Sequence, residues 1–391
     1  MSKKIRTYIE ILLISLRLGL TSFGGPIAHL GYFQNEYVKR KKWLDERTYA
    51  DLIALCQFLP GPASSQVGIS IGMIRGGLFG GVLSWFGFTI PSVIALLIFA
   101  LIMQGFDGHQ LPGWINGLKI VAVAVVAHAV YGMAVKLTPD RTRITIAIIT
   151  AIILLMYPNA IVQFAIIIVA GIIGYLLFKQ KENEESPVLT LTFGKKLGIV
   201  SLATFFLLLF GLPVYRSLFP SFSASIFDVF YRVGSIVFGG GHVVLPLLER
   251  EVVPTGWITA EGFLAGYGAT QAVPGPLFTF SAYIGAVAGG VPTGLLATVA
   301  MFLPSFLLVI GVLPFWNQIR GNMKFRAALT GINAAVVGLL LAALYHPVFT
   351  SAISGPLEFS LALAAFALLM YWKLPPWVVV LCCALAGQIL L

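Results

Sequence analysis

Two arginines and two glutamines lie in apolar sequence next to helix-breaking residues, where their N–H groups could bind an anion. Arg17 precedes a glycine-rich break by a few residues, and Gln57 immediately precedes a proline-rich break. The breaks are Phe23-Gly24-Gly25-Pro26 and Pro60-Gly61-Pro62. Guanidinium and amide groups are donors suited to oxyanions. This pattern predicts a binding site for a small anion.

The same pattern occurs a second time along the chain. Arg232 lies 215 positions after Arg17, and Gln271 lies 214 positions after Gln57. Each is followed by its own break, and these are Phe238-Gly239-Gly240-Gly241 and Pro274-Gly275-Pro276. Further residues match at the same spacing, among them Glu36 with Glu251. We interpret the chain as an internal duplication.

A helix that breaks inside a membrane leaves backbone N–H groups unpaired at the positive end of a helix dipole, and both favour an anion. Irregular backbone persists at membrane depth only where it is buried in protein or lines a polar cavity. Glycine lets the backbone approach a ligand closely, and proline fixes where each helix stops. The alternative is that these residues only kink and pack helices.

Each candidate donor also has a purely structural interpretation. Asp228 lies four residues before Arg232 and Glu10 seven before Arg17, so either arginine could form a structural salt bridge. Gln57 and Gln271 could donate to an oxyanion or cap the carbonyls that the breaks set free.

A second set of polar residues follows the breaks and could carry protons or supply hydroxyls. His29 and His242 follow the glycine breaks, and Ser64 follows the first proline break. For these three, capping is the alternative. Glu36 and Glu251 are candidate proton carriers, with solvated helix-end charges as the alternative.

Composition places these motifs in a membrane protein. Hydrophobic residues make up 58% of the 391 and charged residues only 10%, and apolar runs of about 20 residues recur along the chain. The net charge of +10 is spread over short loops, so it indicates topology and not a nucleic-acid partner. We expect a multi-pass protein of the cell membrane with a cytoplasmic N-terminus.

Loop charge predicts how the broken segments enter the bilayer. The basic run at 39–42 and the N-terminus both favour the cytoplasm, which requires that 8–35 and 48–74 each enter and leave on the same face. The equivalent connector at 249–261 lacks a basic run, so it is expected outside.

The expected fold is therefore all-α, with two inverted-topology repeats. Each repeat has two broken, re-entrant helical hairpins and four spanning helices. The expected domains are an N-terminal repeat over 1–178, a hydrophilic linker with one connecting helix over 179–218, and a C-terminal repeat over 219–391.

The sequence does not contain the residue patterns that other classes of function require. The sequence shows no nucleophile–base set, no metal-ligand cluster and no nucleotide-binding motif, so we expect no enzyme, no cofactor and no direct use of ATP. Inverted repeats with discontinuous helices are a transporter design.

At these motifs the sequence resembles the chromate ion transporter family in its long, two-domain form. The resemblance rests on the Gly-Gly and Pro-Gly-Pro motifs of both halves, with Ala28-His29 in the first and Leu245-Pro246 in the second. It implies export of chromate by a secondary transporter, driven by a proton gradient or the membrane potential.

Sulfate is a dianion of the same shape, so a sulfate importer or exchanger, or a passive anion channel, stays open. A homodimer in the lipid bilayer is also left open.

Overall fold

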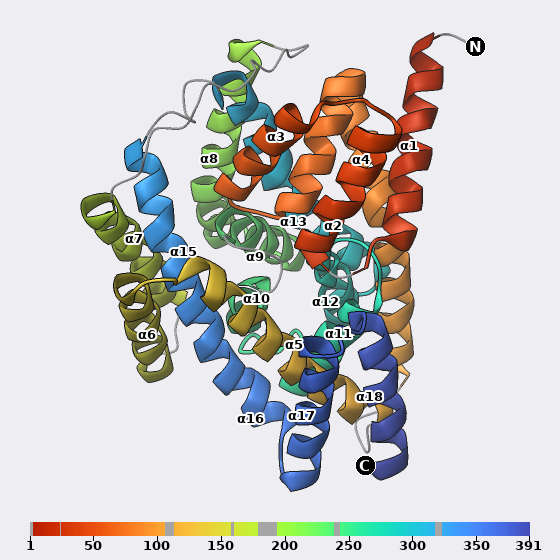
Figure 1. Ribbon diagram of the computed structural model, residues 1–391, viewed down its shortest axis with the longest axis vertical. Coiled ribbons are helices and arrows are strands. Elements are labelled where there is room, and N and C mark those ends of the chain that lie inside the picture. Colours follow the sequence, from red (N-terminus) through yellow and green to blue (C-terminus); the bar gives the residue numbers. More distant parts are fainter. Residues whose placement is uncertain are drawn as a thin grey trace. The chain divides into compact units, whose positions relative to one another are not determined.

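The computed structural model describes residues 3–23, 25–105, 113–157, 160–178, 194–237, 243–316 and 323–391. Most of these residues are helical and the rest form turns, bends and loops, without a strand among them (Figure 1). Within the described residues, five helices are long and apolar enough to cross a membrane, and several shorter helices are also apolar. The expectation of an all-α, multi-pass membrane protein is confirmed.

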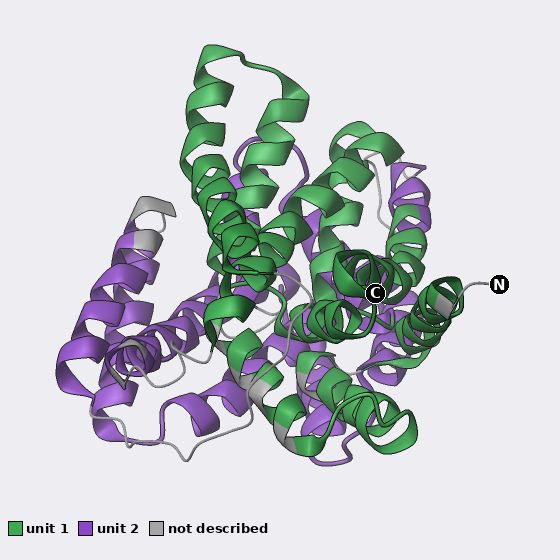
Figure 2. Cartoon of the chain, turned by 90° about the horizontal axis from the view of Figure 1, so that it is seen from above, with its two compact units in different colours: residues 1–97, 182–241, 274–322 green, residues 98–181, 242–273, 323–391 purple. Residues whose placement is uncertain are grey.

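The chain divides into two compact units, and each unit draws on both halves of the sequence (Figure 2). Unit 1 comprises Met1–Leu97, Glu182–Gly241 and Pro274–Asn322. Unit 2 comprises Ile98–Lys181, His242–Val273 and Met323–Leu391.

Unit 1 begins with short helices that lead into a long one. In chain order they are α1 (Lys3–Thr21), α2 (Gly25–Phe33), the π-helix η1 (Gln34–Arg40), α3 (Glu46–Phe58) and α4 (Ala63–Gln104), whose last residues belong to unit 2. Its later helices are α8 (Lys195–Leu218), α9 (Phe222–Ile236), the 3-10 turn η3 (Leu277–Thr279), α12 (Phe280–Gly289), α13 (Val291–Val312) and the 3-10 turn η4 (Leu313–Phe315).

The first break of unit 1 reverses the chain direction. Contacts join Arg17 to Glu36 and Glu10 to Lys41, so residue numbers fall along α1 as they rise along η1. This is an antiparallel helical hairpin, with its tip at Ser22 and Phe23. The expected hairpin over 8–35 thus has the required chain reversal, while its placement in a bilayer stays a prediction.

The second break reverses the chain again. The side chains of Cys56 in α3 and Ser70 in α4 are in contact across it. Farther along α4, Gly76 and Gly77 have non-helical backbone angles, and Gly72 lies against the carbonyl of Gly80. A Cβ atom on Gly72 would lie 2.4 Å from that oxygen, so only glycine permits this approach. The helix therefore folds back on itself before its long apolar part.

Unit 2 holds the remaining spans. They are α5 (Gly113–Leu137), α6 (Arg141–Met156), α7 (Ala160–Leu177), α10 (Val244–Val252), α11 (Ala260–Ala272), α15 (Met323–Ala343), the π-helix η5 (Leu344–Phe349), α16 (Thr350–Ala352), α17 (Pro356–Met370) and α18 (Pro376–Leu390). In it, α5 packs against α18 and α15 packs against α7.

These two packings are equivalent under the sequence repeat. A Cβ on Gly117 of α5 would lie 2.0 Å from the carbonyl oxygen of Cys383, and one on Gly331 of α15 would lie 2.0 Å from that of Ala170. Small residues allow membrane helices to approach this closely, and packing of this kind drives their association. Each half of the sequence thus supplies the partner helix for the other half.

Candidate functional site

The two Pro-Gly-Pro breaks meet the ends of the two repeat-equivalent helices in unit 1. The amide of Gly61 donates to the carbonyl of Val237 at 2.6 Å, just after α9. In the equivalent contact, the amide of Gly275 donates to the carbonyl of Ser22 at 3.0 Å, just after α1. Each proline-rich tip is therefore hydrogen-bonded to the helix end that precedes the glycine break of the other half.

Glycine is required at both tips. Gly61 has φ +114° and Gly275 has φ +103°, which is backbone that side-chain-bearing residues rarely adopt. A Cβ on Gly61 would lie 2.8 Å from both Gln66 Nε2 and Ser305 Oγ, and one on Gly275 would lie 2.9 Å from Ser92 Oγ. The tips are therefore fixed in shape and surrounded by polar atoms.

Gln66, which the sequence analysis did not single out, caps the first proline-rich break. Its Nε2 donates to the carbonyl of Pro60 at 2.7 Å. Gln57, for which donation to an oxyanion and capping of the freed carbonyls stay open, is exposed near the end of α3. The signal was present, since Gln66 is a polar residue in the apolar start of α4.

The N-terminus of α4 carries a buried group of polar side chains. Ser64 Oγ lies 3.2 Å from Nδ1 of His29 on α2, and both residues are buried. Three buried atoms near these tips have no hydrogen-bond partner among the described residues, and they are His29 Nε2, Ser65 Oγ and Ser22 Oγ. The first amides of α4 also have no acceptor inside the helix. Together these groups offer hydrogen bonds to a ligand that accepts several.

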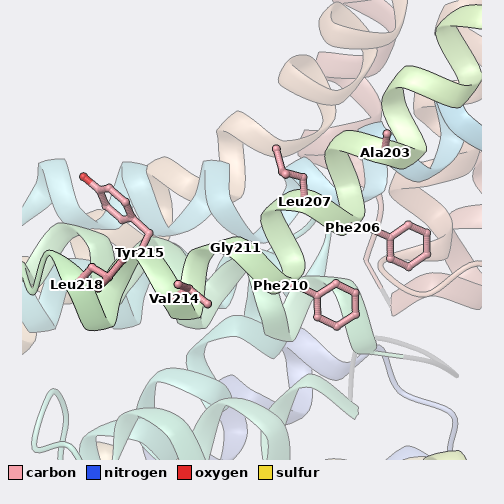
Figure 3. Close-up of a pocket in the computed structure, with 8 residues that line it drawn as sticks. All are labelled: Ala203, Phe206, Leu207, Phe210, Gly211, Val214, Tyr215 and Leu218. Atoms are coloured by element: carbon pink, nitrogen blue, oxygen red, sulfur yellow. The ribbon is translucent and has the colours of Figure 1, made fainter.

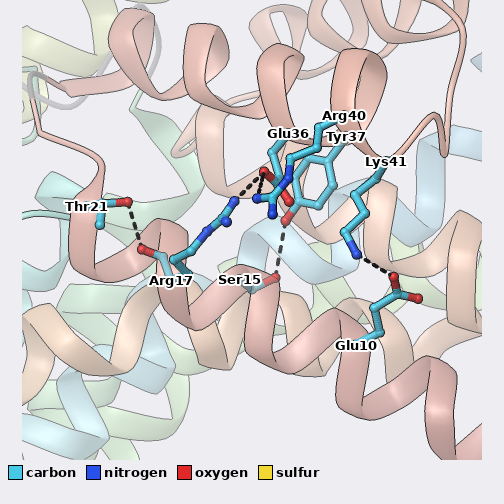
Figure 4. Close-up of polar contacts among 8 residues, drawn as sticks. All are labelled: Glu10, Ser15, Arg17, Thr21, Glu36, Tyr37, Arg40 and Lys41. Carbon is cyan, nitrogen blue, oxygen red and sulfur yellow. Dashed lines mark hydrogen bonds and ion pairs between the residues drawn. The ribbon is translucent and has the colours of Figure 1, made fainter.

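Arg17 lies on the same hairpin, where it is bound to a carboxylate (Figure 4). Arg17 and Arg40 both contact Oε2 of Glu36, Arg40 at 3.2 Å. Glu36 is buried, so our alternative that it is a solvated helix-end charge is wrong. The partner that we had considered for Arg17, Glu10, instead contacts Lys41 at 2.8 Å and Arg75 at 3.8 Å.

Arg232, the repeat equivalent of Arg17, forms the structural salt bridge that the sequence left open. Its Nε lies 3.0 Å from Oδ1 of Asp228, and a second nitrogen lies 3.2 Å from Oδ2. Arg216 of α8 contacts the same Oδ2 at 3.1 Å, and Asp228 is fully buried. Both arginines of the repeat are thus paired, but with carboxylates at different places in the fold.

The other residues of the predicted site are spread over the chain. Gln271 is in unit 2 at the end of α11, and its Nε2 has no partner among the described residues. Glu251 is also in unit 2, in the last turn of α10. Pro274 is in the second tip, and Gly25, with φ +75°, begins α2. Gly24, Phe238, Gly239, Gly240 and His242 lie outside the described residues.

A pocket on α8 is not a candidate for the anion site (Figure 3). Its eight lining residues all belong to α8 and are apolar except for the hydroxyl of Tyr215. None carries a positive charge. Within the described residues there is also no group of three His, Cys, Asp or Glu side chains that could hold a metal ion.

The long apolar helices and the paired interrupted helices define a multi-pass integral membrane protein. The chain belongs to the chromate transporter family, which matches residues 9–175 and 224–388. The resemblance seen at the repeated motifs is thereby confirmed, and the family is one of transporters, not of enzymes.

Relatives of similar length support this membership. The chain is 30% identical to a chromate transport protein of Pseudomonas aeruginosa, over 97% of this chain and 92% of that protein. It is 24% identical to a chromate transport protein of Cupriavidus metallidurans, over 94% and 89% of the two chains. An uncharacterized transporter of Methanocaldococcus jannaschii is 25% identical over 98% and 94%. No solved structure matches the chain.

Proposed function

We propose that this protein is a secondary active transporter that exports chromate, or a related tetrahedral oxyanion, across the cytoplasmic membrane. Family membership supports chromate transport as the activity. Export, and energy from a proton gradient or the membrane potential, are our extension. Both follow the family resemblance, and the lack of a nucleotide-binding motif in the sequence supports an energy source other than ATP.

One observation carries the proposed site: the proline-rich tips and buried polar atoms without partners occur together in unit 1. A dianion at the N-terminus of α4 would accept hydrogen bonds from the first amides of the helix, from Ser65 and from His29. Helix N-termini bind oxyanions through such amides and the helix dipole. Arg17, which lies on the same hairpin as His29 and belongs to the predicted site, would add a charged donor.

We further propose that the two repeats, 1–178 and 219–391, are inverted in the membrane and joined through 179–218. The reciprocal contacts of Gly61 with Val237 and of Gly275 with Ser22 are those of halves related by a two-fold axis. The distribution of basic residues over the loops supports an axis in the membrane plane.

Cysteine labelling tests the inversion. A cysteine replacing Lys41 should react only with a cytoplasmic reagent, and one replacing Thr255 only with an external reagent. Reaction of both from the same side would contradict the inverted arrangement.

Uptake into everted membrane vesicles tests the transport activity. The proposal predicts saturable chromate uptake that sulfate reduces by competition and that an uncoupler abolishes. Flux that does not saturate and ignores the uncoupler would indicate a passive channel instead. Export of sulfate without chromate transport would correct the substrate and leave the mechanism intact.

A further inference from the structure

The Arg17–Glu36 ion pair differs from its counterpart in the second half in a way that bears on how an anion binds. We propose that Glu36 is an internal counter-anion, which a bound oxyanion displaces from Arg17, so that anion binding draws a proton onto Glu36. This inference rests on the proposed function, because it assumes that the protein binds a tetrahedral oxyanion.

Glu36 is held by only one of its two oxygens. Oε2 contacts both Arg17 and Arg40, whereas Oε1 is buried and has no hydrogen-bond partner among the described residues. The side chain of Glu36 is 6% exposed, yet that of Arg17 is 47% exposed. The guanidinium is therefore accessible from one side while the carboxylate that neutralises it is not.

A tetrahedral oxyanion can take the place of this carboxylate. Both present two oxygens to the fork of N–H donors on an arginine, and charge-assisted bonds of this kind are strong. Arg17 has five such donors, and the contact with Glu36 occupies one nitrogen. Displacement leaves Glu36 buried with Arg40 as its remaining partner, and a buried carboxylate that loses a cation is destabilised. Uptake of one proton from solution at a carboxylate oxygen removes this buried negative charge, while Arg40, whose side chain is 60% exposed, stays solvated.

The groups around Glu36 offer no other site for this proton. Arg17 faces it from α1, and Arg40 and Tyr37 lie with it on η1. Tyr37 is itself bonded to Ser15, at 3.2 Å between the two hydroxyl oxygens. From α3, Tyr49 donates to a backbone carbonyl. The other carboxylate on this hairpin, Glu10, is paired with Lys41 and Arg75.

Among the described residues, the equivalent arginine of the second half, Arg232, is held by a carboxylate in a different way. Asp228 has both oxygens bonded, with Arg232 spanning the two and Arg216 adding a third contact. Arg232 is only 20% exposed. Its pairing lies within one helix, and the position equivalent to Asp228 in the first half is Leu13. Arg232 is thus fixed in place, and Arg17 is the arginine that can exchange partners.

The local backbone also fits a moving carboxylate. Glu36 belongs to a seven-residue π-helix between α2 and the loop before α3. Such π-helical turns occur frequently at functional sites. They are less favourable than α-helix, so a shift of this turn is less costly than deformation of α1.

Calorimetry of chromate binding to the purified full-length protein tests the inference. Titrations in two buffers of different ionisation enthalpy, at alkaline pH where chromate is a dianion, give the number of protons taken up. The wild type should take up a proton on binding, and its Kd should rise with pH, by at most about tenfold per pH unit for a single linked proton.

Glu36→Gln should abolish both effects and bind chromate more tightly than the wild type at high pH. Glu10→Gln is the matched control, because Glu10 lies on the same hairpin and is likewise a carboxylate with two cationic partners. This variant should keep the proton uptake.

Three results would overturn the inference. They are chromate binding by the wild type without proton uptake, undiminished proton uptake in Glu36→Gln, and equal loss in Glu10→Gln. The first needs no variant and therefore no assumption about folding. A wild type that binds no oxyanion at all would instead refute the proposed function itself.

Discussion

Replacing the glycine at either proline-rich tip by alanine should disable the protein, and the effect can be worked out from the structure. Gly61 and Gly275 have φ near +110°, at +114° and +103°, and a residue with a side chain held in such a conformation costs about 1–3 kcal/mol. If the backbone relaxes instead, the tip-to-helix hydrogen bond is lost, at about 0.5–1.5 kcal/mol.

Steric contacts add to this. A Cβ on Gly61 forces Gln66 Nε2 away from a distance of 2.8 Å, which breaks its bond to the Pro60 carbonyl. The total is about 2–4 kcal/mol. Because 1.4 kcal/mol is about tenfold in an equilibrium constant, the equilibrium constant between the correct tip and distorted ones should fall by about 100-fold.

Two assays read out this change. Reversible unfolding of the detergent-solubilised protein gives the loss of stability, and initial chromate uptake into everted vesicles gives the loss of activity. Gly61→Ala and Gly275→Ala should both lose stability and activity, since both share the positive φ and the tip-to-helix hydrogen bond. Gly61→Ala should lose more, because only there does the added Cβ displace Gln66. The control is Gly256→Ala, where φ is +73° but no atom lies within 4 Å of the added Cβ. It should cost about 1 kcal/mol and leave uptake intact. Tip variants that match this control would refute the reasoning.

Three further outcomes follow from the packing and the polar contacts. Gly331→Ala should destabilise the protein by several kcal/mol, because the new methyl would overlap a backbone carbonyl, whereas Gly132→Ala, in open space, should be neutral in the same unfolding assay. Asp228→Asn should lower stability by about 3–5 kcal/mol, because it strips a buried carboxylate from two arginines; an unfolding midpoint equal to that of the wild type would contradict this. His29→Gln should raise the KM for chromate more than it lowers stability, and an unchanged KM would remove His29 from the proposed site.

Much of the fold could be predicted because the chain repeats itself in a membrane. The broken segments near 8–35 and 48–74 and the apolar spans correspond to helices of the structure, since hydropathy and paired Gly and Pro leave few alternatives. The reciprocal contacts between the halves could not be foreseen. They depend on which carbonyl each glycine amide reaches, and no periodicity in the sequence encodes that.

The polar residues were less predictable than the helices. Position alone marked Arg17 and Arg232 as equivalent, yet one pairs across a hairpin and the other along its own helix. Glu36 follows the tip at Phe23 by 13 residues, a position typical of a helix-end charge, but the hairpin buries it against α1. Gln66 gave a weak signal because a single polar residue in an apolar segment has many possible roles.

The division of the chain into two compact units could not be predicted either. Each compact unit contains segments of both halves, because a helix of one repeat finds its partner in the other. The packing of α5 on α18 and of α15 on α7 is an example. A helix that exposes small residues must find a close neighbour, and the sequence does not state which one.

Chromate uptake by everted vesicles is the most direct test of the central claim, that this chain is a coupled oxyanion exporter. We predict uptake that saturates with chromate, falls when sulfate is added, collapses with an uncoupler, and is lower in Gly61→Ala than in Gly256→Ala. Equal chromate accumulation in vesicles with and without the protein would contradict it.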